Sequence, residues 1–208
     1  MEVVKGKKVT ILFDAKKCIH SRSCVLDRPD VFVPNVDGEW IYPDRATPDE
    51  VAMLALNCPS GAIRYERHDG VADEKPPVVN TVRVRENGPL ALRADATISG
   101  HGETLRATLC RCGASQNKPF CDNSHTAIQF SATGESALTE FSPLAKRHGK
   151  VTVTPAKNGP LLVEGNLEIV TGTGKTINKV TETAFCRCGG SSNKPYCDGS
   201  HAKIGFQS

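Results

Sequence analysis

The sequence is poor in the residues that fill a large hydrophobic core. Aromatic residues make up 5% of the 208 residues, with a single Trp, and hydrophobic residues reach 38%, which is below the ordinary average for soluble proteins. Such a composition makes the core of one large domain hard to build, whereas several small units with another source of stability fit it well. We therefore expect small domains that depend on more than apolar burial.

The sequence also lacks the signals of several classes of protein. No apolar run approaches the roughly 20 residues of a membrane-spanning helix, and the first residues lack the apolar stretch of an export signal. The 26 basic and 23 acidic residues leave a net charge of +3, too small and dispersed to indicate nucleic-acid binding. No Ser–His–Asp or paired-carboxylate motif indicates hydrolysis. We expect a cytoplasmic protein that is not an enzyme and binds neither membrane nor nucleic acid.

Nine cysteines stand out against these absences. The number is odd, so a complete disulfide framework would leave one cysteine over. In a chain without an export signal, clustered cysteines are more often metal ligands or redox centres. The cysteines form three groups of three: Cys18, Cys24 and Cys58, then Cys110, Cys112 and Cys121, then Cys186, Cys188 and Cys197.

The last two groups lie in an internal repeat. Residues 110–125 and 186–201 are identical at 12 of 16 positions, at an offset of 76 residues. Upstream of each, β-branched and alternating runs separated by Gly, Pro and Asn predict short strands joined by turns. The TGTGKT run at 171–176 is predicted to be the tip of a hairpin, because it lacks the first Gly of a phosphate-binding loop. We place the repeats at residues 78–135 and 148–208.

Residues 1–72 differ from the repeats and predict a separate domain. Residues 7–13 and 62–66 are expected to be strands. Between them, the Thr-Pro-Asp-Glu run at 47–50 supplies good N-cap, N1 and N3 residues for a helix that continues to Asn57. The following stretch, which contains Gly and two consecutive Pro residues, is expected to be a linker.

The spacing within each repeat suits metal binding by two pairs of ligands. Residues two apart on a strand point to the same side, so the first two cysteines can hold one metal atom while the residue between them points away. Residues four apart share a helix face, so the third cysteine and the histidine can hold a second atom. The candidate ligands are Cys110, Cys112, Cys121 and His125 in the first repeat and Cys186, Cys188, Cys197 and His201 in the second.

Three thiolates and one imidazole suit either zinc or an iron–sulfur cluster. Structural zinc sites usually separate paired ligands by two to four residues, so the Cys-x-Cys spacing is unusual for zinc. The spacing alone leaves both metals open.

The whole run resembles the CDGSH (mitoNEET-like) iron–sulfur family, whose pattern is C-x-C-x2-[ST]-x3-P-x-C-D-G-[ST]-H. The first repeat departs from it at one position, where Asn123 replaces Gly. Because Asn is the non-glycine residue that best adopts a left-handed backbone, we expect this site to remain competent. The second repeat matches throughout: Cys186, Cys188, Ser191, Pro195, Cys197, Asp198, Gly199, Ser200 and His201.

The resemblance implies one [2Fe–2S] cluster in each repeat, held by three Cys and one His. Single-copy members of the family form two-fold dimers with a shared β-cap, so two copies imply a monomer folded as an intramolecular pseudo-two-fold pair. Two full ligand sets also predict that each repeat holds its cluster independently.

Histidine ligation leaves the oxidised cluster with one net negative charge, against two for an all-cysteine cluster, which eases reduction. Imidazole can also be protonated. We expect electron transfer, or cluster storage and transfer, with redox or cluster-acceptor partners. The alternatives are a redox- or pH-sensing regulatory module that acts through protein partners and a zinc-stabilised interaction module.

The N-terminal cysteines resemble a divergent single-cluster bacterial-type ferredoxin. Cys18 and Cys24, followed by a Cys-Pro at Cys58, carry the resemblance, and Ser21 stands where the usual middle cysteine would be. It implies a [3Fe–4S] cluster, or a [4Fe–4S] cluster with Ser21, His20 or water as fourth ligand, or an empty site. The expected fold is α+β, with a ferredoxin-like βαββαβ domain that exchanges electrons with a mainly β tandem CDGSH domain.

Overall fold

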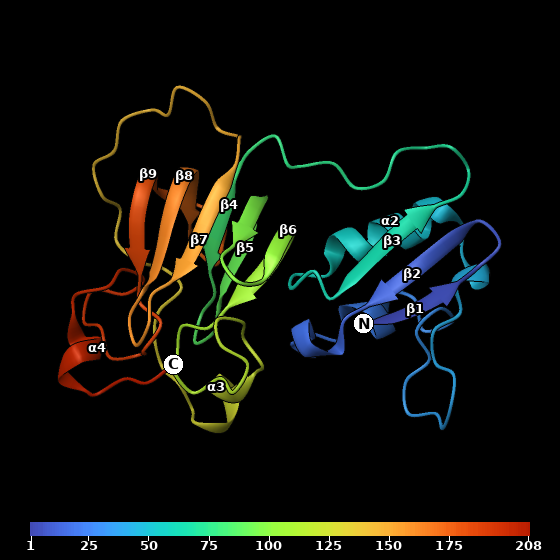
Figure 1. The fold of residues 1–208 in the computed structure, drawn as a ribbon, viewed down its shortest axis with the longest axis horizontal. Helices are drawn as coiled ribbons and strands as arrows, with labels where there is room; N and C mark the ends of the chain where they lie inside the picture. The colour runs from blue at the N-terminus through green and yellow to red at the C-terminus, as the bar shows by residue number, and fades with distance from the viewer. The chain divides into compact units, whose positions relative to one another are not determined.

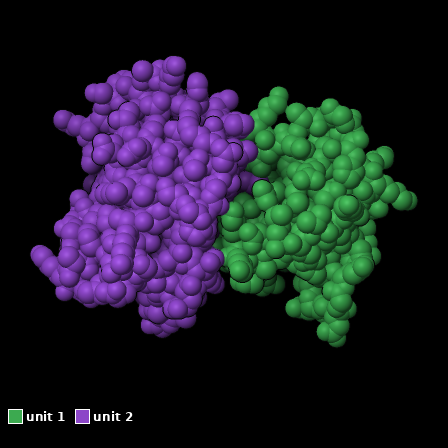
Figure 2. Space-filling view, viewed as in Figure 1, with its two compact units in different colours: residues 1–75 green, residues 76–208 purple.

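The computed structural model describes all 208 residues and divides the chain into two compact units, residues 1–75 and residues 76–208 (Figures 1 and 2). The boundary falls within the predicted linker. No helix in the chain has both the length and the apolar character needed to cross a membrane.

The first unit is built on a three-stranded antiparallel sheet with the order β1-β2-β3. Its strands are β1 (Glu2–Lys5), β2 (Val9–Phe13) and β3 (Ile63–Arg67). All the helices of the unit lie between β2 and β3 in the chain (Figure 1): the short 3-10 helices η1 (Ala15–Lys17) and η2 (Pro43–Arg45), and the α-helices α1 (Ser23–Asp27) and α2 (Pro48–Asn57).

Helix α2 begins where the sequence predicts. The side chain of Thr47 accepts a hydrogen bond from the Glu50 amide, and the Glu50 carboxylate accepts one from the Thr47 amide at 2.8 Å. This capping box satisfies two amides at the start of the helix. The helix buries Leu54 and Ala55 against the sheet and ends at Asn57, so that Cys58 follows it directly.

The βαββαβ topology expected for this unit is wrong, although the α+β class is confirmed. The observed order is ββααβ, with three strands. The amide of Gly6 donates to the Val9 carbonyl at 3.0 Å and closes β1 and β2 into a hairpin, so their connection is too short for a helix. Residues 28–46 contain several Pro residues and form only one isolated bridge, Phe32 with Ile41, instead of a further strand.

The second unit contains six strands, three from each repeat, and each overlaps a segment where the sequence predicts a strand. Those of the first repeat are β4 (Thr81–Val84), β5 (Leu90–Ile98) and β6 (Gly102–Leu109). Those of the second are β7 (Val151–Pro155), β8 (Leu161–Val170) and β9 (Thr176–Phe185), with the predicted hairpin tip between β8 and β9. One short helix follows the last cysteine of each repeat: α3 (Ser124–Ala127) and α4 (Ser200–Lys203).

The first strand of each repeat pairs with strands of both repeats. Strand β4 pairs antiparallel with β5 and parallel with β8, whereas β7 pairs antiparallel with β8 and parallel with β5. Bulges at Arg93/Ala96 in β5 and Glu164/Leu167 in β8, equivalent positions of the repeat, divide each long strand between its two partners. The pairings close a small barrel around one continuous apolar core drawn from both repeats.

Candidate metal centres

The predicted ligands of the first repeat come together in two pairs. Cys110 follows β6, and its sulfur lies 3.9 Å from that of Cys112. Helix α3 carries His125, whose Nδ1 lies 3.5 Å from the sulfur of Cys121. Both pairs lie at one end of the repeat because Cys110 donates its amide to the Pro119 carbonyl, just before Cys121.

The second repeat reproduces this arrangement. The sulfur atoms of Cys186 and Cys188 are 3.8 Å apart, and Nδ1 of His201 lies 3.4 Å from the sulfur of Cys197. The structure therefore brings together all eight predicted donors as four close pairs. Nowhere in the chain do three or more Cys, His, Asp or Glu side chains gather closely enough to hold one metal ion.

The turns before α3 and α4 need a left-handed residue. Asn123 has a φ of 72° and Gly199 a φ of 84°, so Asn123 adopts the conformation expected of it. Asp122 accepts hydrogen bonds from the amides of Ser124 at 3.0 Å and Gln116 at 2.7 Å. Asp198 makes the equivalent bonds in the second repeat. The aspartates thus tie the cluster loop to the start of each helix.

Backbone amides point at the sulfur atoms. In the first repeat, Ala114 donates to Cys112 at 3.5 Å and Asn123 donates to Cys121 at 3.4 Å. In the second, the corresponding donors are Gly190 and Gly199, each at 3.4 Å. Such donors favour the ionised form of a thiol, which is the form that binds metal.

Burial and mutual contact set the protonation of the first repeat without metal. The thiol of Cys110 beside Cys112 lowers the pKa of Cys112 to about 6, and the same contact raises the pKa of Cys110. Burial raises the pKa of Cys121 to about 11. Burial also lowers the pKa of His125, which favours the neutral imidazole that ligation requires. Metal binding here would displace thiol protons and meet an imidazole already disposed to be neutral.

The residue between the first two cysteines points away from them, as predicted, but it is buried rather than solvated. Arg111 is 1% exposed. Its guanidinium donates to the carbonyls of Gly88 at 2.8 Å, Arg85 at 2.6 Å, Ala132 at 2.9 Å and Thr133 at 3.0 Å. It therefore clamps the turn after β4 to the chain segment after α3.

Arg187 repeats this role at 4% exposure, donating to the carbonyls of Gly159 and Ala156 and to the Ser208 hydroxyl. The composition gives no hint of buried arginines. The signal that could have found them is the recurrence of Asn-Gly-Pro-Leu at Asn87 and Asn158, the turn that each guanidinium holds.

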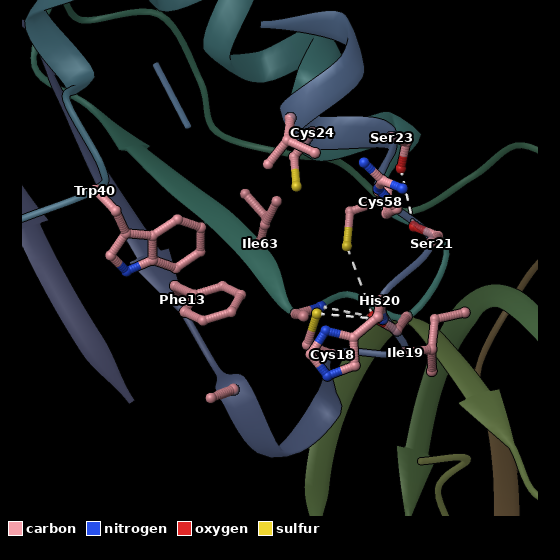
Figure 3. Close-up of a pocket in the computed structure, with 15 residues that line it drawn as sticks. Phe13, Cys18, Ile19, His20, Ser21, Ser23, Cys24, Trp40, Cys58 and Ile63 are labelled. Atoms are coloured by element: carbon pink, nitrogen blue, oxygen red, sulfur yellow. Dashed lines mark hydrogen bonds between the residues drawn. The ribbon is translucent and has the colours of Figure 1, made fainter. Parts of the chain in front are cut away.

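The three N-terminal cysteines also converge. They line one cavity of about 280 Å³ in the first unit, with their sulfur atoms directed into it (Figure 3). Phe13, Trp40 and Ile63 form an apolar wall, and the rings of Phe13 and Trp40 meet edge to face at 5.0 Å. A space enclosed by thiols and apolar side chains fits a thiolate-bound cluster.

The position of the missing cysteine lies at the rim of this cavity. The Ser21 hydroxyl is 3.0 Å from that of Ser23, and both Ser21 and His20 are exposed. The His20 amide donates to the sulfur of Cys18 at 3.4 Å. Burial raises the pKa of Cys18 and Cys24. One buried cysteine, Cys58, and two partly buried ones are thus available as sulfur donors, and the position of the fourth ligand is lined by exposed polar residues.

Two known families match segments of this chain. Residues 80–126 and 158–202 match the family described as "Iron-binding zinc finger CDGSH type", and residues 4–68 match "Divergent 4Fe-4S mono-cluster". The chain therefore contains two CDGSH-type iron-binding regions in one polypeptide, preceded by a divergent 4Fe-4S mono-cluster domain. It is an iron–sulfur protein, and both predicted resemblances are confirmed.

The chain also has curated relatives. The uncharacterized protein YjdI of Escherichia coli K12 and that of Escherichia coli O157:H7 are each 36% identical to this chain over 64 residues. The matched segment covers 30% of this chain and 80% of each relative. The similarity is thus as long as one small domain.

Proposed function

We propose that each repeat holds one [2Fe–2S] cluster through three Cys and one His, and that the chain acts in electron transfer or in cluster storage and transfer. The pairing of the donors carries this proposal. Sulfur–sulfur distances of 3.9 and 3.8 Å and sulfur–nitrogen distances of 3.5 and 3.4 Å define two pairs per repeat. Two pairs suit two iron atoms, whereas structural zinc takes four donors around one atom.

When bound, such a cluster accepts and releases single electrons. The chain contributes the charge balance: a neutral imidazole in place of a thiolate removes one negative charge and raises the potential. Burial around His125 supports this by disfavouring the imidazolium. The amides that donate to Cys112 and Cys121 stabilise negative charge on the sulfur atoms.

We infer a carrier rather than an enzyme, because the other polar groups of each site serve the fold. Ser115 donates to the Phe120 carbonyl, Asp122 holds the start of α3 and Arg111 holds the neighbouring turn. The partners in this proposal are redox proteins or cluster acceptors that approach the sites from the side of the partly buried histidines, His125 and His201.

The reciprocal pairing of each repeat's first strand with the other repeat supports a pseudo-two-fold arrangement within one chain. Because β4 pairs with β8 as β7 pairs with β5, one polypeptide supplies both halves that a dimer would supply. We therefore propose a monomer. Light scattering of the loaded protein at micromolar concentration tests this, and a mass of two chains would contradict it.

For the first unit we propose a third cluster, [3Fe–4S] or [4Fe–4S], on Cys18, Cys24 and Cys58, serving as the point where electrons enter or leave the tandem clusters. The convergence of the three thiols on one apolar cavity supports it. Covalent tethering would hold donor and acceptor at high effective concentration. Anaerobic reconstitution should give iron and sulfide beyond those of the repeats, and Cys58→Ala should remove only that excess. No excess in the unmodified chain would contradict the third cluster.

The carrier function is tested by redox cycling. The anaerobically loaded Cys58→Ala chain is titrated with dithionite and then mixed with an oxidised ferredoxin. We expect one electron per repeat to be taken up and then passed on, with the visible spectrum restored. In a parallel arm, the loaded chain is mixed with an apo-ferredoxin to detect cluster transfer. A colourless zinc-containing protein, or one that neither cycles nor transfers clusters, would overturn the proposal.

A further inference from the structure

The Cys-x-Cys segments of the two repeats touch each other. Cys112 and Cys188, one from each repeat, face each other in an antiparallel β-bridge. Both are predicted cluster ligands. The backbone of a ligand in one site is therefore in direct contact with the backbone of a ligand in the other.

Two glycines permit this approach. A Cβ atom on Gly113 would lie 2.8 Å from the carbonyl carbon of Cys188 and closer still to its oxygen, and one on Gly189 would lie 2.9 Å from the carbonyl carbon of Cys112. Real Cβ atoms do not approach backbone so closely, and the backbone of a held ligand cannot swing aside as a flexible side chain can. The contact is reciprocal, so neither Cys-x-Cys segment can shift without pressing on the other.

Each segment is also fixed to its own repeat. The amide of Cys110 donates to the Pro119 carbonyl at 2.8 Å, and that of Cys186 donates to Pro195 at 2.8 Å. Arg111 adds four hydrogen bonds on the side away from the ligands. When one Cys-x-Cys segment moves at the Cys112–Cys188 bridge, the rest of its ligand loop therefore moves with it, because the packed structure cannot deform at the bridge alone.

We propose that the two cluster sites are coupled through the Cys112–Cys188 contact, so that a cluster bound in one repeat holds the ligand segment of the other in its binding geometry. This inference rests on the proposed function and replaces the expectation of independent sites. When cluster binding orders the Cys-x-Cys segment of one repeat, the segment of the other repeat loses less conformational entropy on binding its own cluster. Coupling of the usual size would change cluster retention by about fivefold or more.

Gly189 and Gly100 form a matched pair for the test. Their φ values are 80° and 81°, and Gly100 lies in the turn between β5 and β6, at the end of β6 away from Cys110. A Cβ on Gly100 meets nothing within 4 Å, whereas one on Gly189 meets the Cys112 backbone of the first repeat. Alanine at either position strains its own turn similarly, but only Gly189→Ala presses on the other repeat.

The test uses the full chain with Cys58→Ala, to remove N-terminal iron, and His125→Cys, which marks the first cluster with a distinct absorption and electron paramagnetic resonance spectrum. Loss of the marked cluster to an iron chelator at neutral pH is timed with and without each alanine. We expect Gly189→Ala to speed this loss about fivefold or more, and Gly100→Ala to change it less than about twofold. Equal rates in the two variants would overturn the coupling.

A second variant guards against a Gly189→Ala chain that does not fold. Cys197→Ala removes a ligand of the second site and so prevents cluster binding there, while Gly113, Gly189 and Cys188 stay in place. The marked first cluster should again be lost about fivefold faster or more, and an unchanged rate would overturn the proposal. Measuring acid-labile sulfide in the parent chain distinguishes failure of the coupling from failure of the proposed function. If the parent chain contains no sulfide, the proposed function fails together with the coupling. If it contains sulfide and the rates are equal, only the coupling fails.

Discussion

Replacing Arg111 tests how the cluster domain is held together. Its buried guanidinium donates four hydrogen bonds to carbonyls of two separate segments. A net contribution of about 1 kcal/mol per bond predicts that Arg111→Ala lowers the free energy of unfolding of this unit by about 4 kcal/mol. Arg187 makes three such bonds, so Arg187→Ala should cost about 3 kcal/mol.

Arg111→Lys separates charge from geometry. A lysine keeps the positive charge, but its ammonium is a point donor that cannot span four carbonyls as a planar fork can. We therefore expect Arg111→Lys to recover less than half of the stability lost in Arg111→Ala. If the buried charge itself were what matters, the lysine variant would behave like the unmodified protein.

The assay has an internal control, because the single Trp of the chain, Trp40, lies in the first unit. Urea unfolding is followed by cluster absorbance for the second unit and by Trp40 fluorescence for the first. Arg111→Ala should shift the absorbance midpoint and leave the fluorescence midpoint in place. A loss below about 1 kcal/mol, the contribution of one bond, or a shift of the fluorescence midpoint alone, would refute the reasoning.

Three further outcomes are expected. Arg147 pairs at 2.6 Å with the Glu168 carboxylate, which is 2% exposed and also pairs with Lys179, so Arg147→Ala should lower the urea midpoint of the second unit because it removes one of two cations from a buried carboxylate; an unchanged midpoint would contradict this. Burial lowers the pKa of His125, so its contribution to stability is complete above the ordinary value of about 6.5 and is lost as pH falls through the lower folded value. Loss of the first cluster should therefore speed up on acidification and His125→Cys should slow it, whereas equal rates at neutral and mildly acidic pH would argue against histidine ligation. Asn123 has a φ of 72°, so Asn123→Ala should cost about 1 kcal/mol in urea unfolding and Asn123→Gly should cost nothing; equal stability of the two variants would show that the turn does not need a left-handed residue.

Local signals predicted the elements that carry the metal ligands. The spacing of the ligands in the sequence predicts that Cys110 lies beside Cys112 and Cys121 beside His125, because strand and helix periodicity are local properties. The capping box at Thr47 likewise fixed the start of α2 from four residues.

The features that escaped prediction depend on contacts between distant segments. The parallel pairings of β4 with β8 and of β7 with β5 join strands of different repeats, and no periodicity within one repeat predicts such a pairing. The ferredoxin resemblance predicts a helix after the first strand, but the turn at Gly6 leads directly from β1 into β2 and leaves no room for a helix. The Cys112–Cys188 contact depends on two glycines whose role is visible only once both repeats are in place.

The central claim, a histidine-ligated [2Fe–2S] cluster in each repeat, is tested most directly by one measurement on the reconstituted Cys58→Ala chain. Iron and acid-labile sulfide are counted per chain, and the reduced protein, labelled with ¹⁵N at histidine, is examined by pulsed electron paramagnetic resonance. The account predicts two iron and two sulfide ions per repeat, with nitrogen coupling that disappears from one cluster in His125→Cys and from the other in His201→Cys. One metal ion per repeat without sulfide, or a cluster signal without nitrogen coupling, would contradict it.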